Sequence, residues 1–178
     1  MSHLFNWPFL NLDFFFNFDL LRNDKIDLDF SDQRRALSDG YNNKFLTETD
    51  FMAVVPRDFT TVDKVTTSDL ADLPCIIVAG PTQEAEEEAY YRDVLGIQSP
   101  FIATSTGDEA QLMIASNQGY LIANSRTISL INQEVTKVVA LYNGDALLHQ
   151  KYYTYWKKDN SGYYIEEFAD LLKEQFEK

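Results

Sequence analysis

Small polar residues follow three predicted strands, at places where they could hold a ligand. The three runs are Ser31-Asp32-Gln33, Ala79-Gly80-Pro81-Thr82 and Thr104-Ser105-Thr106. The second and third lead directly into predicted helices, whose free N–H groups and positive dipole suit a carboxylate or another anion. Ordinary helix capping would also place Ser and Thr there. The sequence therefore leaves open whether the three runs converge on one binding crevice.

Side chains suited to catalysis are few in this sequence. Cys75 lies inside an apolar run, where a thiol is more often a small hydrophobic group than a nucleophile. His3 and His149 have no acidic or cysteine partner at the spacing of zinc ligands. The acids between Glu84 and Glu88 are best explained as the solvated face of a helix, because nothing apolar nearby would raise a carboxyl pKa. We expect no enzyme activity, no metal and no cofactor.

Charge and composition exclude several partners. The chain has 178 residues, 45% of them hydrophobic, which is enough for one domain or two small lobes. A formal net charge of −13 opposes direct contact with nucleic acid or with an anionic membrane. The single cysteine, the lack of a membrane-length apolar run and the lack of a basic segment before the Phe-rich start predict a cytoplasmic protein.

Apolar runs and helical patterns alternate along the chain. Predicted strands are 26–30, 51–55, 75–78, 101–103, 120–123, 138–141 and 152–156. Helical spacing predicts helices at 14–21, 69–73, 83–95, 107–117 and 163–176. Buried strands that alternate with helices indicate an α/β sheet covered on both faces. In such sheets a ligand binds outside the carboxyl ends of the strands.

Five segments of the chain have a recognisable order. They are LRNDKIDLD (21–29), LTETDFMAVVPRD (46–58), VTTSDLADLPCIIVAG (65–80), DEAQLMIASNQGYLIANS (108–125) and YYTYWKKDNSGYYIEEFADLLKEQF (152–176). In this order they resemble the effector-binding region of LysR-type transcription regulators. Together they span roughly residues 15 to 176. The resemblance adds to the α/β prediction a specific architecture and a specific kind of function.

The resemblance implies a two-lobed fold like that of type 2 periplasmic binding proteins. The first lobe would hold residues 1–57 and 147–178, and the second lobe residues 58–146. A small effector, which we expect to be anionic, would bind in the cleft between the lobes of a homodimer. By position, its contacts would be Ser31, Asp32, Gln33, Gly80, Thr104, Ser105 and Asn124.

The sequence departs from the family pattern in three ways. It shows no counterpart of the basic winged helix-turn-helix, so we expect DNA contact only through a part outside this chain. The first strand and helix of the first lobe also have no counterpart, which predicts a truncated lobe. A strand end expected to read Leu-Pro reads Ala123-Asn124. Three alternatives stay open: a stand-alone solute-binding protein, a dimerisation module with an empty cleft, and a small enzyme.

Overall fold

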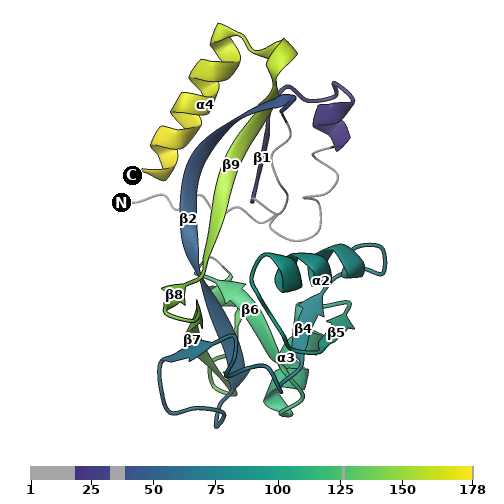
Figure 1. Ribbon diagram of the computed structural model, residues 1–178, viewed down its shortest axis with the longest axis vertical. Helices are drawn as coiled ribbons and strands as arrows, with labels where there is room; N and C mark the ends of the chain where they lie inside the picture. The colour runs from purple at the N-terminus through teal and green to yellow at the C-terminus, as the bar shows by residue number, and fades with distance from the viewer. Residues whose placement is uncertain (1–18, 33–38, 126, 178) are drawn as a thin grey trace. The chain divides into compact units, whose positions relative to one another are not determined.

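The computed structural model describes residues 19–32, 39–125 and 127–177 (Figure 1). The chain packs into two compact units. Unit 1 comprises residues 1–47 and 151–178, and unit 2 comprises residues 48–150. The boundaries differ from the lobe limits predicted at residues 57 and 147, because the segment from Phe51 to Pro56 is hydrogen-bonded to strands of unit 2.

Unit 2 is built on a mixed sheet. Its strands are the C-terminal part of β2 (Tyr41–Pro56), β3 (Lys64–Thr66), β4 (Cys75–Val78), β5 (Phe101–Thr104), β6 (Tyr120–Asn124), β7 (Thr136–Asn143) and β8 (Ala146–Leu147). The hydrogen-bonded order is β3-β7-β2-β6-β4-β5, with β8 paired to β7. The neighbours β6, β4 and β5 run parallel, whereas β2 is antiparallel to both β6 and β7.

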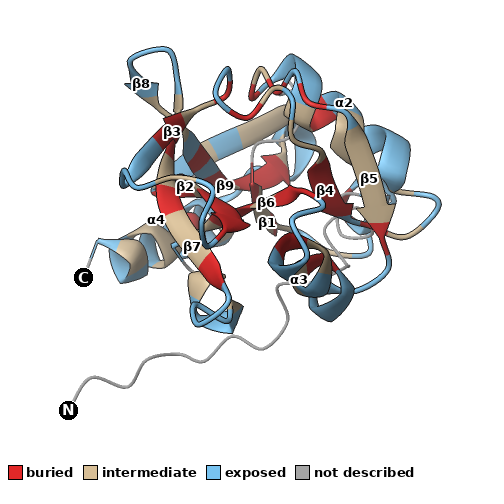
Figure 2. Ribbon diagram, turned by 90° about the horizontal axis from the view of Figure 1, so that it is seen from below, coloured by how far each residue is buried: buried red, intermediate tan, exposed pale blue. Residues whose placement is uncertain are grey.

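Helices α2 (Glu84–Asp93) and α3 (Gly107–Ala115) cover opposite faces of this sheet, which lies between them in Figure 2. Successive side chains of β2 point to opposite faces of the sheet, so the core has two parts. On one face, Ala53 and Val55 pack with Tyr90 of α2. Val54 points to the other face and packs with Ile114 of α3. A short 3-10 helix, η1 (Ile128–Leu130), connects β6 to β7. The predicted α/β sheet covered on both faces is confirmed in this unit.

The described residues of unit 1 include three strands and a long helix. Strand β1 (Asp29–Asp32) pairs antiparallel with β9 (His149–Lys157), which neighbours the N-terminal part of β2. After the 3-10 helix η2 (Lys158–Asn160), α4 (Tyr163–Phe176) packs on the sheet, with bounds as predicted. The Phe176 ring stacks on Phe30 at 5.5 Å between centroids, and Phe30 stacks on Tyr152 at 5.8 Å.

Two local predictions need correction, and a third lies mostly outside the described residues. The strand predicted at 26–30 is β1, which starts at Asp29 and includes Ser31 and Asp32, so these two residues do not follow a strand. Residues 69–73 form turns rather than an α-helix, with hydrogen bonds from the Ala71 N–H to the Ser68 carbonyl and from the Leu73 N–H to the Leu70 carbonyl. The helix predicted at 14–21 lies mostly outside the described residues, of which 19–22 are helical.

Candidate functional site

The polar strand ends of unit 2 lie along one edge of its sheet. Parallel pairing places Val78 of β4 opposite Thr104 of β5, and the Ala79 N–H donates to the Thr104 carbonyl at 3.0 Å. Strand β6 runs parallel to β4 on its other side, so its final residue, Asn124, comes to the same edge. Gly80, Thr104, Ser105 and Asn124 therefore share the carboxyl edge of three neighbouring strands.

The junction between β5 and α3 is held by local hydrogen bonds. The Glu109 N–H donates to the Thr106 hydroxyl at 3.2 Å, which makes Thr106 the cap of α3. The Glu109 carboxylate turns back and accepts the Ser105 N–H at 3.3 Å. The Thr104 hydroxyl is buried and donates to the Thr106 carbonyl at 3.2 Å. Thr104 and Thr106 therefore serve the local fold, whereas Ser105 is exposed and its N–H already donates to a carboxylate oxygen.

Gly80 begins the junction between β4 and α2. Its carbonyl accepts the N–H groups of Gln83 at 2.9 Å and Glu84 at 3.1 Å. A Cβ at Gly80 would meet Gln83 Oε1 at 3.7 Å, an ordinary contact, so sterics do not require glycine here. Gln83 is the N-cap residue of α2 without a side-chain cap hydrogen bond. The acids Glu84, Glu86 and Glu87 occupy the first turn, where the helix dipole favours negative side chains.

Asn124 connects the β6 end to β9 and to the following turn. Its side-chain amide donates to Gln150 Oε1 at 2.6 Å, and its Oδ1 accepts the Thr127 N–H at 3.1 Å. Gln150 is buried beside His149, whose Nδ1 lies 2.9 Å from the Asp50 carboxylate. Asn124 therefore has a structural role at the end of β6.

Thr49, which sequence reasoning missed, precedes Asp50 in β2. Its hydroxyl is buried and has no hydrogen-bond partner. Leaving a hydroxyl buried without a partner costs about 1–3 kcal/mol, so such groups are uncommon. Its only sequence signal is the alternation along the strand, because Thr49, Phe51 and Ala53 are alternate residues and all three are buried.

The unit 1 candidates lie in β1. Ser31 and Asp32 pair with Tyr153 and Tyr152 of β9, and the Ser31 side chain hydrogen-bonds the Tyr155 hydroxyl. Burial raises the pKa of Tyr155, so this hydroxyl stays protonated at neutral pH. Gln33, the third predicted contact of this run, lies outside the described residues.

Asp29, at the start of β1, is a second group that sequence reasoning missed. The residue is 4% exposed, and its Oδ1 accepts the Phe30 N–H at 2.8 Å. Its other carboxyl oxygen is buried without a hydrogen-bond partner. Burial raises the pKa of Asp29, since the charged form loses its hydration. The alternating pattern around Asp29 predicts a strand but not that a carboxyl group points to its buried side.

Cys75 is buried in β4 and belongs to a polar cluster in the core of unit 2. Its thiol hydrogen-bonds the Tyr120 hydroxyl, which lies 2.9 Å from Ser99 Oγ. Burial raises the pKa of Cys75 to about 12. At neutral pH the group is therefore the thiol rather than the reactive thiolate, in agreement with its interpretation as a core residue.

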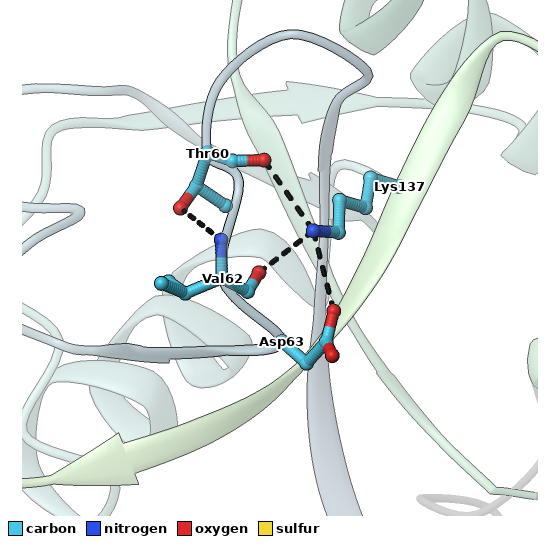
Figure 3. Close-up of polar contacts among 4 residues, drawn as sticks. All are labelled: Thr60, Val62, Asp63 and Lys137. Atoms are coloured by element: carbon cyan, nitrogen blue, oxygen red, sulfur yellow. Dashed lines mark hydrogen bonds and ion pairs between the residues drawn. The ribbon is translucent and has the colours of Figure 1, made fainter.

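Lys137 is held by three oxygen atoms at the other end of the unit 2 strands. Lys137 of β7 reaches into the loop after β2, where Nζ contacts the Val62 carbonyl at 2.8 Å, the Thr60 carbonyl at 3.4 Å and the Asp63 carboxylate at 3.3 Å (Figure 3). Lys137 pairs with Val55, near the end of β2 that lies beside the beginning of β6. The Lys137 charge thus fixes a loop away from the strand ends.

The described residues contain no group of three or more His, Cys, Asp or Glu side chains that could hold a metal ion. No helix within the described ranges has the length and apolar character needed to cross a membrane.

The sequence matches the LysR substrate binding domain family over residues 8–177, and the chain therefore belongs to that family. Comparison with curated proteins returned no match. Among solved structures, the chain is similar to the regulatory domain of MetR, a LysR family regulator from N. meningitidis, with 15% identity and a TM-score of 0.65. That match covers 89% of this chain and 74% of the other.

Two OxyR structures extend this likeness. The reduced regulatory domain from Pseudomonas aeruginosa shares 15% identity with a TM-score of 0.64, over 90% of this chain and 78% of that one. A Corynebacterium glutamicum OxyR C206 mutant shares 18% identity with a TM-score of 0.69, over 91% of this chain and 52% of that one. At these identities the structures establish the fold, which is that of LysR regulatory domains.

Proposed function

We propose that this chain is the ligand-sensing regulatory domain of a LysR-type transcription regulator and that it binds a small anionic metabolite at the carboxyl edge of β4, β5 and β6. One observation carries the proposal beyond family membership: Gly80, Ser105 and Asn124 share that edge within unit 2. Ligands of α/β sheets bind outside the carboxyl ends of strands, where the connecting turns present free backbone groups.

The Ser105 amide supports the choice of an anionic ligand. Its N–H already binds a carboxylate oxygen, that of Glu109, at the N-terminal end of α3. At 3.3 Å this bond is longer than the usual 2.7–2.9 Å of a charge-assisted hydrogen bond. A ligand carboxylate would replace Glu109 at this amide and would interact with the same helix dipole. The displaced Glu109 side chain is exposed and would be solvated by water.

Other parts of the proposal rest on the sequence alone. Contacts from Ser31, Asp32 and Gln33, the ligand cleft between two lobes and the homodimer stay predictions. So do the cytoplasmic location and the expectation that this chain itself does not touch DNA. Ligand binding would act on a regulator only through a difference in affinity between its conformations.

A thermal-shift screen of the whole chain against small carboxylates tests the proposal. A ligand present at 100 times its Kd stabilises the folded state by about 2.7 kcal/mol. For a chain of this size that corresponds to a rise in Tm of about 5–10 °C. We expect one or more carboxylates to give a saturable rise, and the corresponding amides to give none.

Variants at the two ends of α3 locate the binding site. Ser105→Ala removes a hydroxyl at the proposed site, whereas Ser116→Ala removes one from the exposed C-cap of the same helix. We expect Ser105→Ala to weaken the ligand-induced shift and Ser116→Ala to leave it unchanged. No shift from any carboxylate in protein shown to be folded would contradict the proposal and favour a dimerisation module.

A further inference from the structure

Helix α4 in unit 1 has two apolar stripes. The inner stripe faces the sheet and consists of Ile165, Ala169, Leu172 and Phe176, all buried or half-buried. The outer stripe consists of Tyr164, Phe168 and Leu171, which are 84%, 55% and 52% exposed. At 3.6 residues per turn, the outer stripe is rotated by roughly 100° from the inner one.

The outer stripe is a continuous surface rather than scattered residues. Its members have the i, i+4, i+7 spacing of neighbours on one helix face, and Tyr163, which is 71% exposed, contacts Tyr164 with ring centroids 5.6 Å apart. Single exposed apolar residues, such as Leu112 on α3, are normal on protein surfaces. A contiguous apolar row is instead typical of a surface that binds another protein.

Negative charge borders the outer stripe. Helix α4 contains four carboxylates and a single lysine, Lys173. Lys173 pairs with Glu177, and Asp170 pairs with Lys44 of β2. Among the described residues, no lysine or arginine pairs with Glu167 or Glu174. Both are exposed, and helical geometry places them beside Leu171 on the side away from the sheet.

We propose that the outer stripe, with Glu167 and Glu174 at its border, is a docking surface for a basic amphipathic helix of another protein. The partner's apolar face covers Tyr164, Phe168 and Leu171, and its Lys or Arg side chains pair with the two glutamates. The stripe is roughly 10 Å long, at a rise of 1.5 Å per residue, which matches about two turns of a partner helix. A second copy of this chain fits less well, because it would bring two acidic borders together and each copy carries a net charge of −13.

Two designed peptides provide the probe. One is a fluorescein-labelled helix with Leu at i, i+3, i+4 and i+7 spacing and Lys at the other positions, and the second has Glu in place of Lys. Fluorescence anisotropy with the whole chain should show binding of the Lys peptide at least about tenfold tighter than of the Glu peptide. This binding should weaken as salt rises, because exposed charges are screened.

Matched variants separate a local surface from the general charge of the protein. The double variant Phe168→Ser/Leu171→Ser should lower affinity for the Lys peptide by about tenfold or more, since it removes the apolar contact. Leu112→Ser, at a leucine of α3 that is more exposed than Phe168 or Leu171, should leave it unchanged. Glu167→Gln/Glu174→Gln should weaken binding, whereas Glu48→Gln/Glu134→Gln, with the same net charge, should not.

Two results would overturn the proposal. Equal loss of affinity in both charge pairs, or in both apolar variants, would show that the Lys peptide responds only to the overall charge or apolar surface. The second result would come from light scattering, which measures the oligomeric state across a wide concentration range. A dimer of the wild-type chain that Phe168→Ser/Leu171→Ser dissociates would assign the stripe to a second copy. Circular dichroism of each variant verifies that the loss of binding is not a loss of fold.

Discussion

Helices α3 and α4 show how the two units use amphipathic helices differently. Helix α3 has a side-chain cap at Thr106 and buries Ala110 and Ile114 in the core of unit 2. Helix α4 has Gly162 as its N-cap, which supplies no side-chain cap, and only its residue Ala169 is fully buried. A capped, well-packed helix can hold a binding edge in place, whereas a helix with an open apolar stripe can bind a partner.

Among the described residues, each unit contains one buried polar group without a hydrogen-bond partner, the Thr49 hydroxyl in unit 2 and an Asp29 carboxyl oxygen in unit 1. In unit 2 the Cys75, Ser99 and Tyr120 side chains satisfy one another in the core. In unit 1 the Asp29 carboxyl group keeps one buried oxygen without a hydrogen bond. The buried Asp29 group can also carry a charge, so unit 1 has stability to gain from its removal. Close packing at Gly119 means that unit 2 has stability to lose from an added methyl group.

The largest expected effect is in unit 2, at the turn between α3 and β6. A Cβ at Gly119 would lie 2.6 Å from the Pro74 carbonyl oxygen, which accepts the Tyr120 N–H and cannot move freely. Gly119→Ala should cost about 3 kcal/mol, near the upper end of overpacking effects. Urea unfolding measures this free energy.

Gly107→Ala is the matched control for that variant. A Cβ at Gly107, the first residue of α3, would meet nothing within 4 Å. The substitution should be neutral or slightly stabilising, because alanine has the higher helix propensity. Similar losses in both variants would contradict the steric account of the turn.

In unit 1, Asp29→Asn should stabilise the protein by about 1 kcal/mol at pH 7, because it removes a poorly satisfied buried charge. The folded-state pKa of Asp29 is raised by burial, so the wild-type carboxyl favours folding below its unfolded pKa. That contribution is lost as pH rises through the folded pKa. The stability difference between variant and wild type should therefore grow from about pH 4 upward and then level off.

Urea unfolding of Asp29→Asn across pH 3–8 checks this, with the exposed Asp39→Asn as control. A constant difference at all pH values would mean that Asp29 is not charged while buried. A loss of stability at pH 7 would show that the carboxylate has a partner in solution.

Helix capping provides the smallest effects and the most direct contrast between α3 and α4. Thr106→Ala should cost about 1 kcal/mol, because it removes the acceptor of the Glu109 N–H. Gly162→Ser should stabilise α4 by about 0.5 kcal/mol, since a side chain there meets nothing within 4 Å and can cap the helix. Thermal unfolding measures the change in Tm of each variant. Changes of the same sign would contradict the proposed difference between the capped α3 and the uncapped α4.

Periodicity in the sequence predicts the elements that bury a regular face. The strand at 75–78 and the helix at 163–176 have the predicted bounds because their apolar spacing persists to both ends. The polar first half of β2 and the three-residue β3 were missed, because their residues make strands through partners distant in sequence.

The candidate site was predictable in position but not in its hydrogen bonds. Polar residues at three parallel strand ends indicate an edge, and pairing of β4 with β5 and β6 places Gly80, Ser105 and Asn124 there. The contacts Glu109–Ser105 and Asn124–Gln150 depend on side-chain conformation and strand register. Those are properties of the folded chain that no spacing rule supplies.

The most direct test of the proposed ligand site is the backbone amide spectrum of the ¹⁵N-labelled chain during titration with a carboxylate from the thermal-shift screen. We expect the Ser105 amide to shift most, together with the amides of Gly80 and Asn124, as the ligand replaces the Glu109 carboxylate. Saturable shifts elsewhere, with these three amides unchanged, would contradict a ligand site at the carboxyl edge of β4, β5 and β6.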